Sequence, residues 1–514
     1  MSGEVSRRAF LGAAALGSAG YLAGAEGEGL PRAIDAAVEE ALKVWGVPGA
    51  CVAVVRNDEV AHLKGYGVRD IEGKQSFDPD TLFGVASCTK AFASAAAAVL
   101  VGQGKLGWDD PVRKHLPWFR MSDPLADREV TLRDLLCHRT GLSDVHDALY
   151  YRTPWGPEEV ARRVEHLPLS FPFRSTFHYS GVGYFVAGLT IAGAAGKPWH
   201  EFASERLLRP LGMQGVWTRA EAMKVKNRSS AHLKTKEGKV VVIPWYPDDK
   251  LPDASGRLKT TGRSLAEWVR LQLAGGKHAG KEVVPAGPLR ETHTPQVVVR
   301  KEGFWAEVFP GPETVQVSHG LGWFIHDYQG RRVVSHGGTT DGFRTSINLV
   351  PEARLGIVIL ANLQETRMPE ALRDTLLDLT LGLPRKDRNA RYQALVREAE
   401  EKKLAEKKAQ AAMRRTGTRP SRELDAFVGA YAEPAYREAR VARAGDGLTL
   451  GWAGFRAGLR HFHHDTFVAE GDGGVNVYNE NPLDGEHVTF GLDAEGEVSW
   501  FELWGQRFRR PKPR

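Results

Sequence analysis

The spacing of apolar positions in the first hundred residues predicts a helix, a β hairpin and a buried helix. Residues 33–45 repeat with a helical period and end at a Pro-Gly turn. Two β-rich runs, 50–56 and 59–67, follow and meet at Asn57-Asp58, a pair suited to a tight turn. Residues 91–101 are apolar on every side, which indicates a helix with no exposed face.

Beyond this point the pattern changes from helical to β. Helical periods broken by Pro and Gly run from about residue 111 to 280, at 132–137, 157–166, 183–195 and 265–274. From residue 320, β runs separated by turn residues precede a closing helix, at 321–328, 331–335, 343–350, 355–360 and 368–381. This order predicts an α+β fold in which both chain ends form one antiparallel sheet flanked by helices, beside an all-helical subdomain.

A charged stretch separates this region from the tail. Residues 385–415 are rich in Ala, Glu and Lys without Gly or Pro, which indicates a solvated helix or helical spacer. The tail carries evenly spaced β runs typical of a small barrel or sandwich, at 448–452, 466–470, 475–478, 488–492 and 498–503. The predicted divisions are 1–25, 26–384, 385–421 and 422–514.

The composition excludes several classes of protein. Of 514 residues, 42% are hydrophobic and 26% charged, which excludes a disordered, collagen-like or coiled-coil chain. No apolar run reaches the roughly 20 residues that span a bilayer, which excludes a polytopic membrane protein. The three cysteines fit neither a disulfide framework nor a C-x-x-C metal site.

The first 25 residues have the layout of an export signal. Arg7-Arg8 precedes a stretch rich in Ala, Gly and Leu, and Ala23-Gly24-Ala25 offers a small-x-small cleavage pattern. The alternative, a fraying amphipathic helix, is less favoured because the stretch has no polar face. We therefore expect a bacterial twin-arginine signal and a mature protein from Glu26, located in the periplasm or secreted.

The positive charge is concentrated outside the main body of the chain. The formal net charge is +6 and the pI about 9.0. Residues 385–416 hold 11 basic and 5 acidic residues, which accounts for the whole excess. A nucleic-acid partner is therefore not expected. A weak contact of this connector with an anionic envelope surface is retained as a hypothesis.

The first candidate for chemistry is Ser87-Cys88-Thr89-Lys90, which follows a β-like run and opens the apolar helix. Positions i and i+3 share a helix face, so the Lys90 amine can reach the Ser87 hydroxyl. The positive potential of a helix N-terminus favours an alkoxide at Ser87 and a neutral Lys90. Only Ser87 among 21 serines has a lysine three residues later. The alternative is that Ser87 merely caps the helix.

Two other motifs are less specific by themselves. Tyr179-Ser180-Gly181 opens a helical run after a loop, where a tyrosine can accept a proton if nearby cations lower its pKa. The alternative is a packed aromatic ring. His336-Gly337-Gly338-Thr339 ends a β run, and its glycines would let a substrate backbone approach. A plain β turn is the alternative there, and a lipase-type oxyanion loop would need a G-x-S-x-G motif, which the chain lacks.

Taken together, the three motifs resemble those of the serine β-lactamase and penicillin-binding protein superfamily, most closely its class C-like branch. That branch includes D-aminopeptidases, DD-carboxypeptidases and esterases. The resemblance covers about residues 30–383, with family-like flanking stretches at 130–142 and 207–213. The tail stretches 431–436 and 459–467 resemble the lipocalin-like C-terminal domain of some of these peptidases. The implied fold is a β-lactamase/transpeptidase-like domain followed by a small β-barrel.

The resemblance implies a mechanism for a small-molecule ester or peptide substrate. Ser87 attacks a carbonyl to form an acyl-enzyme, and Lys90 and Tyr179 share the general-base role. The backbone N–H groups of Ser87 and Thr339 form the oxyanion hole, typically worth about 3–4 kcal/mol per donor. Residues expected to line the substrate pocket are His336, Gly337, Gly338 and Gly181. No metal or cofactor is implied.

Two positions depart from the family pattern. The second motif usually has Asn where this chain has Gly181, and the third usually begins with Lys where this chain has His336. A neutral histidine binds a substrate carboxylate less strongly than a lysine does. We therefore expect weak β-lactam hydrolysis at most. Both departures fit an esterase or a D-amino-acid peptidase, because histidine here is familiar in the aminopeptidase-like branch.

Some alternatives stay open. The cluster His461, His463, His464 and Asp465 is interpreted as a structural strand rather than a metal site, and Cys88 as a packing residue. A non-catalytic binding or scaffold protein on the same fold, or an acyltransferase, would share these motifs. The tail domain could cap the site or join subunits into a homo-oligomer.

Overall fold

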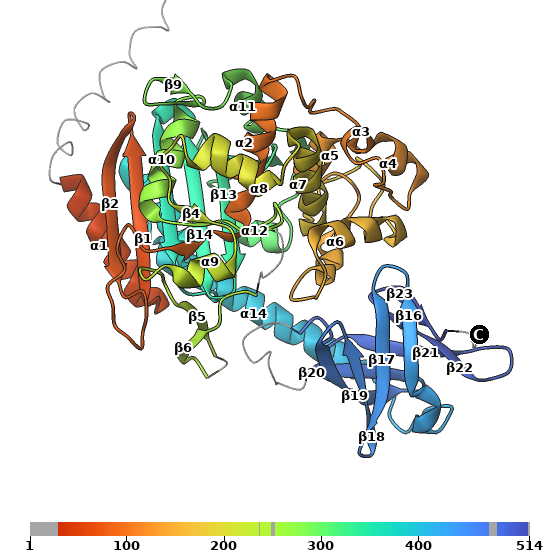
Figure 1. Ribbon diagram of the computed structural model, residues 1–514. Helices are drawn as coiled ribbons and strands as arrows, with labels where there is room; N and C mark the ends of the chain where they lie inside the picture. The colour runs from red at the N-terminus through yellow and green to blue at the C-terminus, as the bar shows by residue number, and fades with distance from the viewer. Residues whose placement is uncertain (1–28, 236, 248–251, 472–480, 512–514) are drawn as a thin grey trace, which may run out of the picture.

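The computed structural model describes residues 29–235, 237–247, 252–471 and 481–511. Within these residues, the main sheet has eight strands in the order β10-β11-β12-β13-β14-β15-β1-β2, all antiparallel (Figure 1). Its strands are β1 (Gly49–Arg56), β2 (Glu59–Gly67), β10 (Val297–Val298), β11 (Val317–His319), β12 (Phe324–Tyr328), β13 (Arg331–Thr340), β14 (Phe343–Val350) and β15 (Leu355–Ala361). The predicted α+β fold is confirmed, because strands from both ends of this region pair in one sheet.

Helices cover both faces of the sheet. Successive side chains of the central strands point to opposite faces, and the side chains on both faces are buried. Val52 and Ile357 face α1 (Gly29–Trp45) and α13 (Met368–Thr380) in one core. Ala53 and Val358 face the larger core, which includes α2 (Thr89–Gly102) and α10 (Gly262–Leu273). Helix α2 is buried along almost its whole length, as its apolar sequence predicts.

The insertion between β2 and β11 forms the helical subdomain and three small sheets. Its helices are α3 (Val112–His115), α4 (Pro124–Glu129), α5 (Leu132–Leu136), α6 (Pro157–Arg163), α7 (Gly181–Ala195), α8 (Trp199–Ala203), α9 (Arg219–Lys224), α11 (Ala286–Thr292) and α12 (Phe304–Val308). The short strands are β3 (Phe83–Gly84), β4 (Gly215–Val216), β5 (Ala231–Lys234), β6 (Val240–Ile243), β7 (Lys259–Thr260), β8 (Lys277–His278) and β9 (Lys281–Glu282). Single turns of tighter or wider helix include η1 (Ala86–Cys88), η2 (Asp144–Leu149), η3 (Val164–His166), η4 (Ser204–Leu208), η5 (Pro351–Ala353) and η6 (Leu424–Phe427).

The tail forms a separate closed β-barrel, which confirms the predicted small C-terminal barrel. In the described part of the tail its strands are β16 (Gly429–Glu433), β17 (Arg437–Ala444), β18 (Gly447–Trp452), β19 (Phe455–His463), β20 (Thr466–Gly471), β21 (His487–Leu492), β22 (Val498–Leu503) and β23 (Gln506–Arg509). The strand predicted at 475–478 lies outside the described residues, as does the predicted export signal at 1–25.

A long helix, α14 (Arg388–Ala412), connects the two domains (Figure 1). The prediction of a solvated helix is wrong for its first turns. Arg388 is buried and forms ion pairs of 2.9 Å with Glu313 and 2.8 Å with Asp378, while Tyr392 donates to Asp374. Residues 393–396 are half-buried, and residues 400–412 are exposed. The first turns of the connector are thus part of the core of the main domain.

The barrel also contacts the helical subdomain directly. The Arg163 guanidinium of α6 donates to the Ala435 carbonyl at 3.0 Å, and the Trp155 and Trp452 rings meet edge to face at 5.6 Å. A third contact joins His146 of η2 to the Tyr436 hydroxyl at 3.4 Å. Among the described residues, no helix is long and apolar enough to cross a membrane.

Candidate active site

Ser87 lies in a strained turn between β3 and α2. Its sequence pattern predicts a position at the start of the α-helix, but it occupies the single turn η1, and α2 begins at Thr89. Ala86 immediately before it has φ 48°, a left-handed conformation that costs free energy in a non-glycine residue and is common at functional sites. The Ser87 side chain keeps some solvent exposure, whereas its neighbours are buried. The turn therefore presents the hydroxyl to the outside of the core.

Lys90 is held one helical turn away with its amine aimed at Ser87. Its Nζ donates to the Ser87 Oγ at 3.3 Å and to the Ser255 carbonyl at 2.7 Å. The side chain is only 2% exposed, so burial lowers the pKa of Lys90 to about 8, while the negative charges of Asp147 and Asp253 oppose this. A buried amine with a pKa near neutrality can serve as a general base.

Tyr179 lies above the same amine, with Lys90 Nζ 4.8 Å from the centre of its ring. The ring stacks on His138 at 4.4 Å, and the Ser180 N–H donates to His138 Nδ1 at 3.1 Å. Burial raises the pKa of Tyr179, and a hydrogen bond with Ser87 acts in the opposite direction. Tyr179 is therefore a neutral phenol near pH 7 that can pass a proton between Ser87 and another group.

The third motif lies on the end of β13 that faces the Ser87 turn. Residues 336–340 pair with β14 but extend past the end of β12. The Cys88 thiol donates to the His336 carbonyl at 3.3 Å, and a Cβ added to Gly338 would overlap the Val85 carbonyl oxygen and lie 3.2 Å from the Ala86 Cβ. Only a glycine allows β13 to approach the turn this closely. Thr339, an exposed residue, directly follows Gly338 on β13, and the oxyanion hole is expected there.

His336 is buried, and its ring is neutral. Its Nδ1 lies 2.6 Å from the Gly337 carbonyl, which requires the proton on Nδ1 and leaves Nε2 as an acceptor. Burial, together with the Lys90 charge, keeps the pKa of His336 well below its usual range. Gly337 beside it is exposed. This position therefore carries no positive charge.

Gly181 is placed differently from what its motif suggests. The residue is buried beneath Tyr150, and its N–H donates to the Asp147 carboxylate at 2.9 Å. A Cβ at this position would come within 2.7 Å of two Tyr150 ring carbons and closer still to the hydroxyl oxygen. The site therefore contains an aromatic ring and a carboxylate from η2 and the residue that follows it.

Several residues of the site are not predicted from the sequence because they belong to no motif: His138, Asp147, Tyr150, Ser255 and Asp341. Asp341 follows β13, is buried, and accepts a hydrogen bond from the Tyr151 hydroxyl at 2.9 Å as well as an ion pair from Arg152. A small cavity of about 20 Å³ opens beside it, between β13, β14 and residues 245–259. The only sequence signal is the family-like stretch that contains His138.

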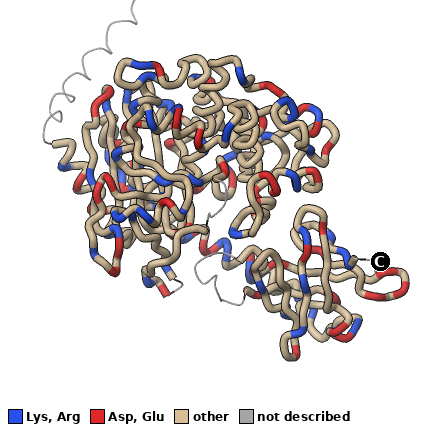
Figure 2. The backbone as a smooth tube through the Cα atoms, in the orientation of Figure 1, with Lys and Arg blue, Asp and Glu red and all other residues tan. Residues whose placement is uncertain are grey.

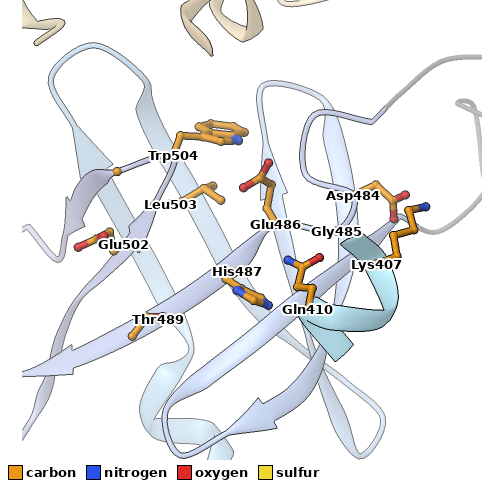
Figure 3. Close-up of a pocket in the computed structure, with 11 residues that line it drawn as sticks. Lys407, Gln410, Asp484, Gly485, Glu486, His487, Thr489, Glu502, Leu503 and Trp504 are labelled. Atoms are coloured by element: carbon orange, nitrogen blue, oxygen red, sulfur yellow. The ribbon is translucent and has the colours of Figure 1, made fainter. Parts of the chain in front are cut away.

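A cavity on the barrel side lies far along the chain from these motifs. It has a volume of about 500 Å³ and opens between the end of α14 and the barrel (Figure 3). Its lining combines acidic, basic and amide side chains, among them Lys407, Gln410, Asp484, Glu486 and Glu502. None of the three motifs contributes to it.

The histidine cluster of the tail makes structural bonds. His461 Nε2 lies 2.8 Å from the His464 carbonyl, and the Asp465 carboxylate accepts from the Ser421 N–H and hydroxyl at 2.7 Å each. A bulge between His461 and His463 also breaks the strand alternation. No group of three or more His, Cys, Asp or Glu residues suited to a metal occurs in the part of the chain that the structure describes.

Comparison with known proteins assigns the main domain to a family. A family model for β-lactamase matches residues 34–382, so the chain belongs to the β-lactamase family. A second model, for a domain of unknown function called DUF3471, matches residues 413–509. The suspected resemblance to the serine β-lactamase and penicillin-binding protein superfamily is thus confirmed.

Similar proteins include one named as a hydrolase and one named flp. "Unguisins hydrolase ungD'" of Aspergillus campestris is 28% identical over 431 residues, covering 81% of this chain and 78% of that protein. "Protein flp" of Staphylococcus aureus is 28% identical over 341 residues, covering 66% of this chain and 64% of that protein. The chain therefore spans slightly less than two thirds of flp.

Solved structures share the fold. The octameric penicillin-binding protein homologue from Pyrococcus abyssi superposes with a TM-score of 0.60 at 21% identity, covering 93% of this chain and 99% of that chain. D-amino acid amidase from Ochrobactrum anthropi SV3 gives a TM-score of 0.56 at 22% identity, and covers 69% and 99%. EstCE1, described as a hydrolase with promiscuous acyltransferase activity, gives 0.57 at 20% identity and covers 68% and 98%.

Proposed function

We propose that this protein is a serine hydrolase that acts through an acyl-enzyme on an ester or on a peptide or amide containing a D-amino acid. The observation that carries the proposal is the buried Lys90 amine, 3.3 Å from the Ser87 hydroxyl and under the Tyr179 ring. A lysine is rarely buried without a partner or a task, and this one faces a hydroxyl held in a strained turn.

The geometry supports a two-step reaction. Neutral Lys90 takes the Ser87 proton, directly or through the Tyr179 hydroxyl, as Ser87 Oγ attacks the carbonyl carbon. The Ser87 and Thr339 N–H groups stabilise the oxyanion, and the proton passes to the leaving alcohol or amine as its bond to carbon breaks. Water, deprotonated by the same groups, then cleaves the acyl–oxygen bond and restores Ser87.

The substrate class follows from what surrounds this centre. The neutral His336 supplies no fixed cation for a substrate carboxylate, and Gly181 supplies no side-chain amide. Weak β-lactam hydrolysis at most is expected. The names of an unguisins hydrolase, a D-amino acid amidase and a hydrolase with acyltransferase activity among the similar proteins support esters and D-configured amides as the first compounds to test.

A covalent probe tests the proposal. A fluorophosphonate should label the mature protein at Ser87, as located by peptide mass spectrometry, and Ser87→Ala should abolish labelling and turnover. Ser175→Ala, at an exposed serine of the helical subdomain, is the matched control. Labelling at another residue would contradict the proposal.

The same assay separates the remaining functions. A stable acyl adduct without turnover on ester, D-amino-acid amide and cephalosporin panels would instead support a binding or scaffold protein. Preferential transfer to an added alcohol or amine over water would support an acyltransferase.

We further propose that the protein is exported by its twin-arginine signal. Arg7-Arg8 and the Ala-Gly-Leu stretch that follows support this. Replacing both arginines by lysine should retain the protein in the cytoplasm of a bacterial host, as measured by cell fractionation. Unchanged export of that variant would refute twin-arginine transport.

A further inference from the structure

The site contains a carboxylate that belongs to none of the three motifs. Asp147 lies in η2, between α5 and α6, and is half-buried. One of its oxygens, Oδ1, accepts the N–H groups of Gly181 at 2.9 Å and Val182 at 3.4 Å. The other, Oδ2, accepts the Tyr150 hydroxyl at 2.9 Å. Asp147 therefore links the start of α7 to Tyr150.

Gly181 is the residue that makes this arrangement possible. The Tyr150 ring packs over its Cα, in the space that any side chain at position 181 would need. The same ring lies 4.7 Å from the ring of Phe185 on the next turn of α7. Where the family motif carries an amide side chain, this chain therefore places a carboxylate and a phenol that come from another element.

Asp147 binds the backbone of Gly181, two residues after Tyr179, whose ring centre lies 4.8 Å from Lys90 Nζ. At this placement the charges of Asp147 and Lys90 interact. Burial raises the pKa of Asp147, and the ammonium of Lys90 acts in the opposite direction. Other titratable or charged groups facing Lys90 from neighbouring elements are Cys88, His138, Tyr179, Tyr184, Asp253, Arg257, His319 and His336. The three histidines are held neutral by burial.

We propose that Asp147, locked by Tyr150 over Gly181, is a positioning residue that sets the protonation of Lys90 and fixes the start of α7 beside Tyr179. This inference rests on the proposed function, because it gives Lys90 the role of the base. The Asp147 carboxylate bonds to Tyr150 and to the N–H groups of Gly181 and Val182, so it acts through Lys90 and the α7 backbone.

The physical reason is the balance of two effects on one amine. Burial alone would push the pKa of Lys90 far down, and a weakly basic amine removes the serine proton less well. A nearby carboxylate restores part of that basicity. Burial raises the pKa of Asp147 to about 7, and the hydrogen bonds from the Tyr150 hydroxyl and the Gly181 N–H keep it from rising further. The carboxylate is therefore mostly ionised in the more alkaline range where Lys90 titrates.

The decisive experiment measures Lys90 directly and needs no substrate. The ¹³Cε resonances of lysine-labelled full-length protein are titrated from pH 5 to 10, with Lys90→Arg used to assign the Lys90 signal. In Asp147→Asn, which keeps the hydrogen-bonding shape but removes the charge, the Lys90 transition should move to lower pH by about one unit. An unchanged transition would overturn the inference.

Two further variants should shift the Lys90 transition by different amounts. Tyr150→Phe removes the hydroxyl that stabilises the carboxylate, so it should shift the transition in the same direction but by less. Asp144→Asn, at an exposed carboxylate of the same turn, should leave it in place because solvent screens that charge. A shift in Asp144→Asn as large as in Asp147→Asn would contradict a specific role for Asp147.

Fluorophosphonate labelling of Ser87 separates the two proposals. Wild-type protein that titrates as expected but is not labelled would refute the hydrolase function and leave the Lys90–Asp147 coupling standing. Wild-type protein that is labelled, with Asp147→Asn showing the same pH–rate profile, would refute the role of Asp147 alone. The expected result is labelling in both, with the acidic limb of the variant displaced to lower pH.

Discussion

At the scale of single residues, the site depends on a lysine whose surroundings oppose its charge. Lys90 packs against two tyrosine rings and donates to a backbone carbonyl that comes from residue 255, far along the chain. The carbonyl favours the ammonium form, whereas burial disfavours it more strongly. The outcome is an amine that can both take and return a proton near neutral pH.

This predicts the pH dependence of acylation. Because the pKa of Lys90 is lowered to about 8, only about a tenth of it is neutral at pH 7, so the rate of Ser87 acylation should rise with pH and level off above about 8. The limb belongs to the Lys90–Asp147 pair as a unit, because the charge of each group affects the pKa of the other. Stopped-flow labelling between pH 5.5 and 9.5 measures it. A flat profile would contradict a lysine base.

A second residue-scale prediction concerns the glycine of the second motif. Restoring the family residue with Gly181→Asn should destabilise the protein by about 1–3 kcal/mol, because the new side chain overlaps the Tyr150 ring. Adding Tyr150→Ala should make room for the new side chain. The double variant should therefore lose less free energy of unfolding than the two single variants lose when their losses are added. Urea unfolding measures all four proteins. Strict additivity would show that the two residues do not compete for space.

At the scale of elements, α14 is more than a spacer because its first turns are tied into the catalytic domain. Glu313, nearly fully buried, receives charged hydrogen bonds from Lys386, Arg388 and Arg391, and these bonds lower its pKa far below the ordinary value. Breaking one buried ion pair leaves its partner charge uncompensated, which is costly.

We therefore expect Arg388→Gln to lower the free energy of unfolding by about 3–5 kcal/mol, because Glu313 and Asp378 would stay buried without it. Arg397→Gln, at an exposed position of the same helix, should change it by less than about 0.5 kcal/mol. Thermal and denaturant unfolding of both variants make the comparison. Equal effects would mean that the helix is not anchored through Arg388.

At the scale of the whole molecule, the barrel is docked against the helical subdomain that carries η2. Acidic and basic residues are interspersed along the backbone of both domains (Figure 2). The direct contacts are aromatic and hydrogen-bonded: Trp155 with Trp452, His146 with Tyr436, and Arg163 with the Ala435 carbonyl. His146 is the immediate neighbour of Asp147, so the barrel touches the turn that reaches the active site.

Weakening this contact should speed amide hydrogen exchange in both domains, at the segments that meet there. Trp155→Ala removes the ring that packs on Trp452 and under the Arg163 guanidinium, 3.6 Å away, and should weaken docking by about 1–3 kcal/mol. Faster amide hydrogen exchange at residues 144–149 and 433–436 would report it. Trp118→Ala, whose ring stacks on Arg162 instead, should leave those segments protected. The same exchange in both variants would contradict a docked barrel.

The sequence alone determined the elements whose signals are local. The hairpin at Asn57-Asp58, where both residues have positive φ, the all-round apolar α2 and the strands β14 and β15 follow from periodicity and turn residues within a few positions. Ser87 and Lys90 also came from spacing, because three residues on one helical turn bring two side chains together whatever the rest of the chain does.

Only the tertiary structure decided what surrounds that pair. Asp147, Ser255 and His138 lie on separate elements of the insertion, and no local pattern marks them, because their contacts join residues tens to hundreds of positions apart. From the sequence, Gly181 indicates only that a polar side chain is missing. In the structure, the Tyr150 ring occupies the space where that side chain would lie. The nucleophile and base were therefore readable from the chain, whereas the groups that set their protonation arise from packing between distant segments.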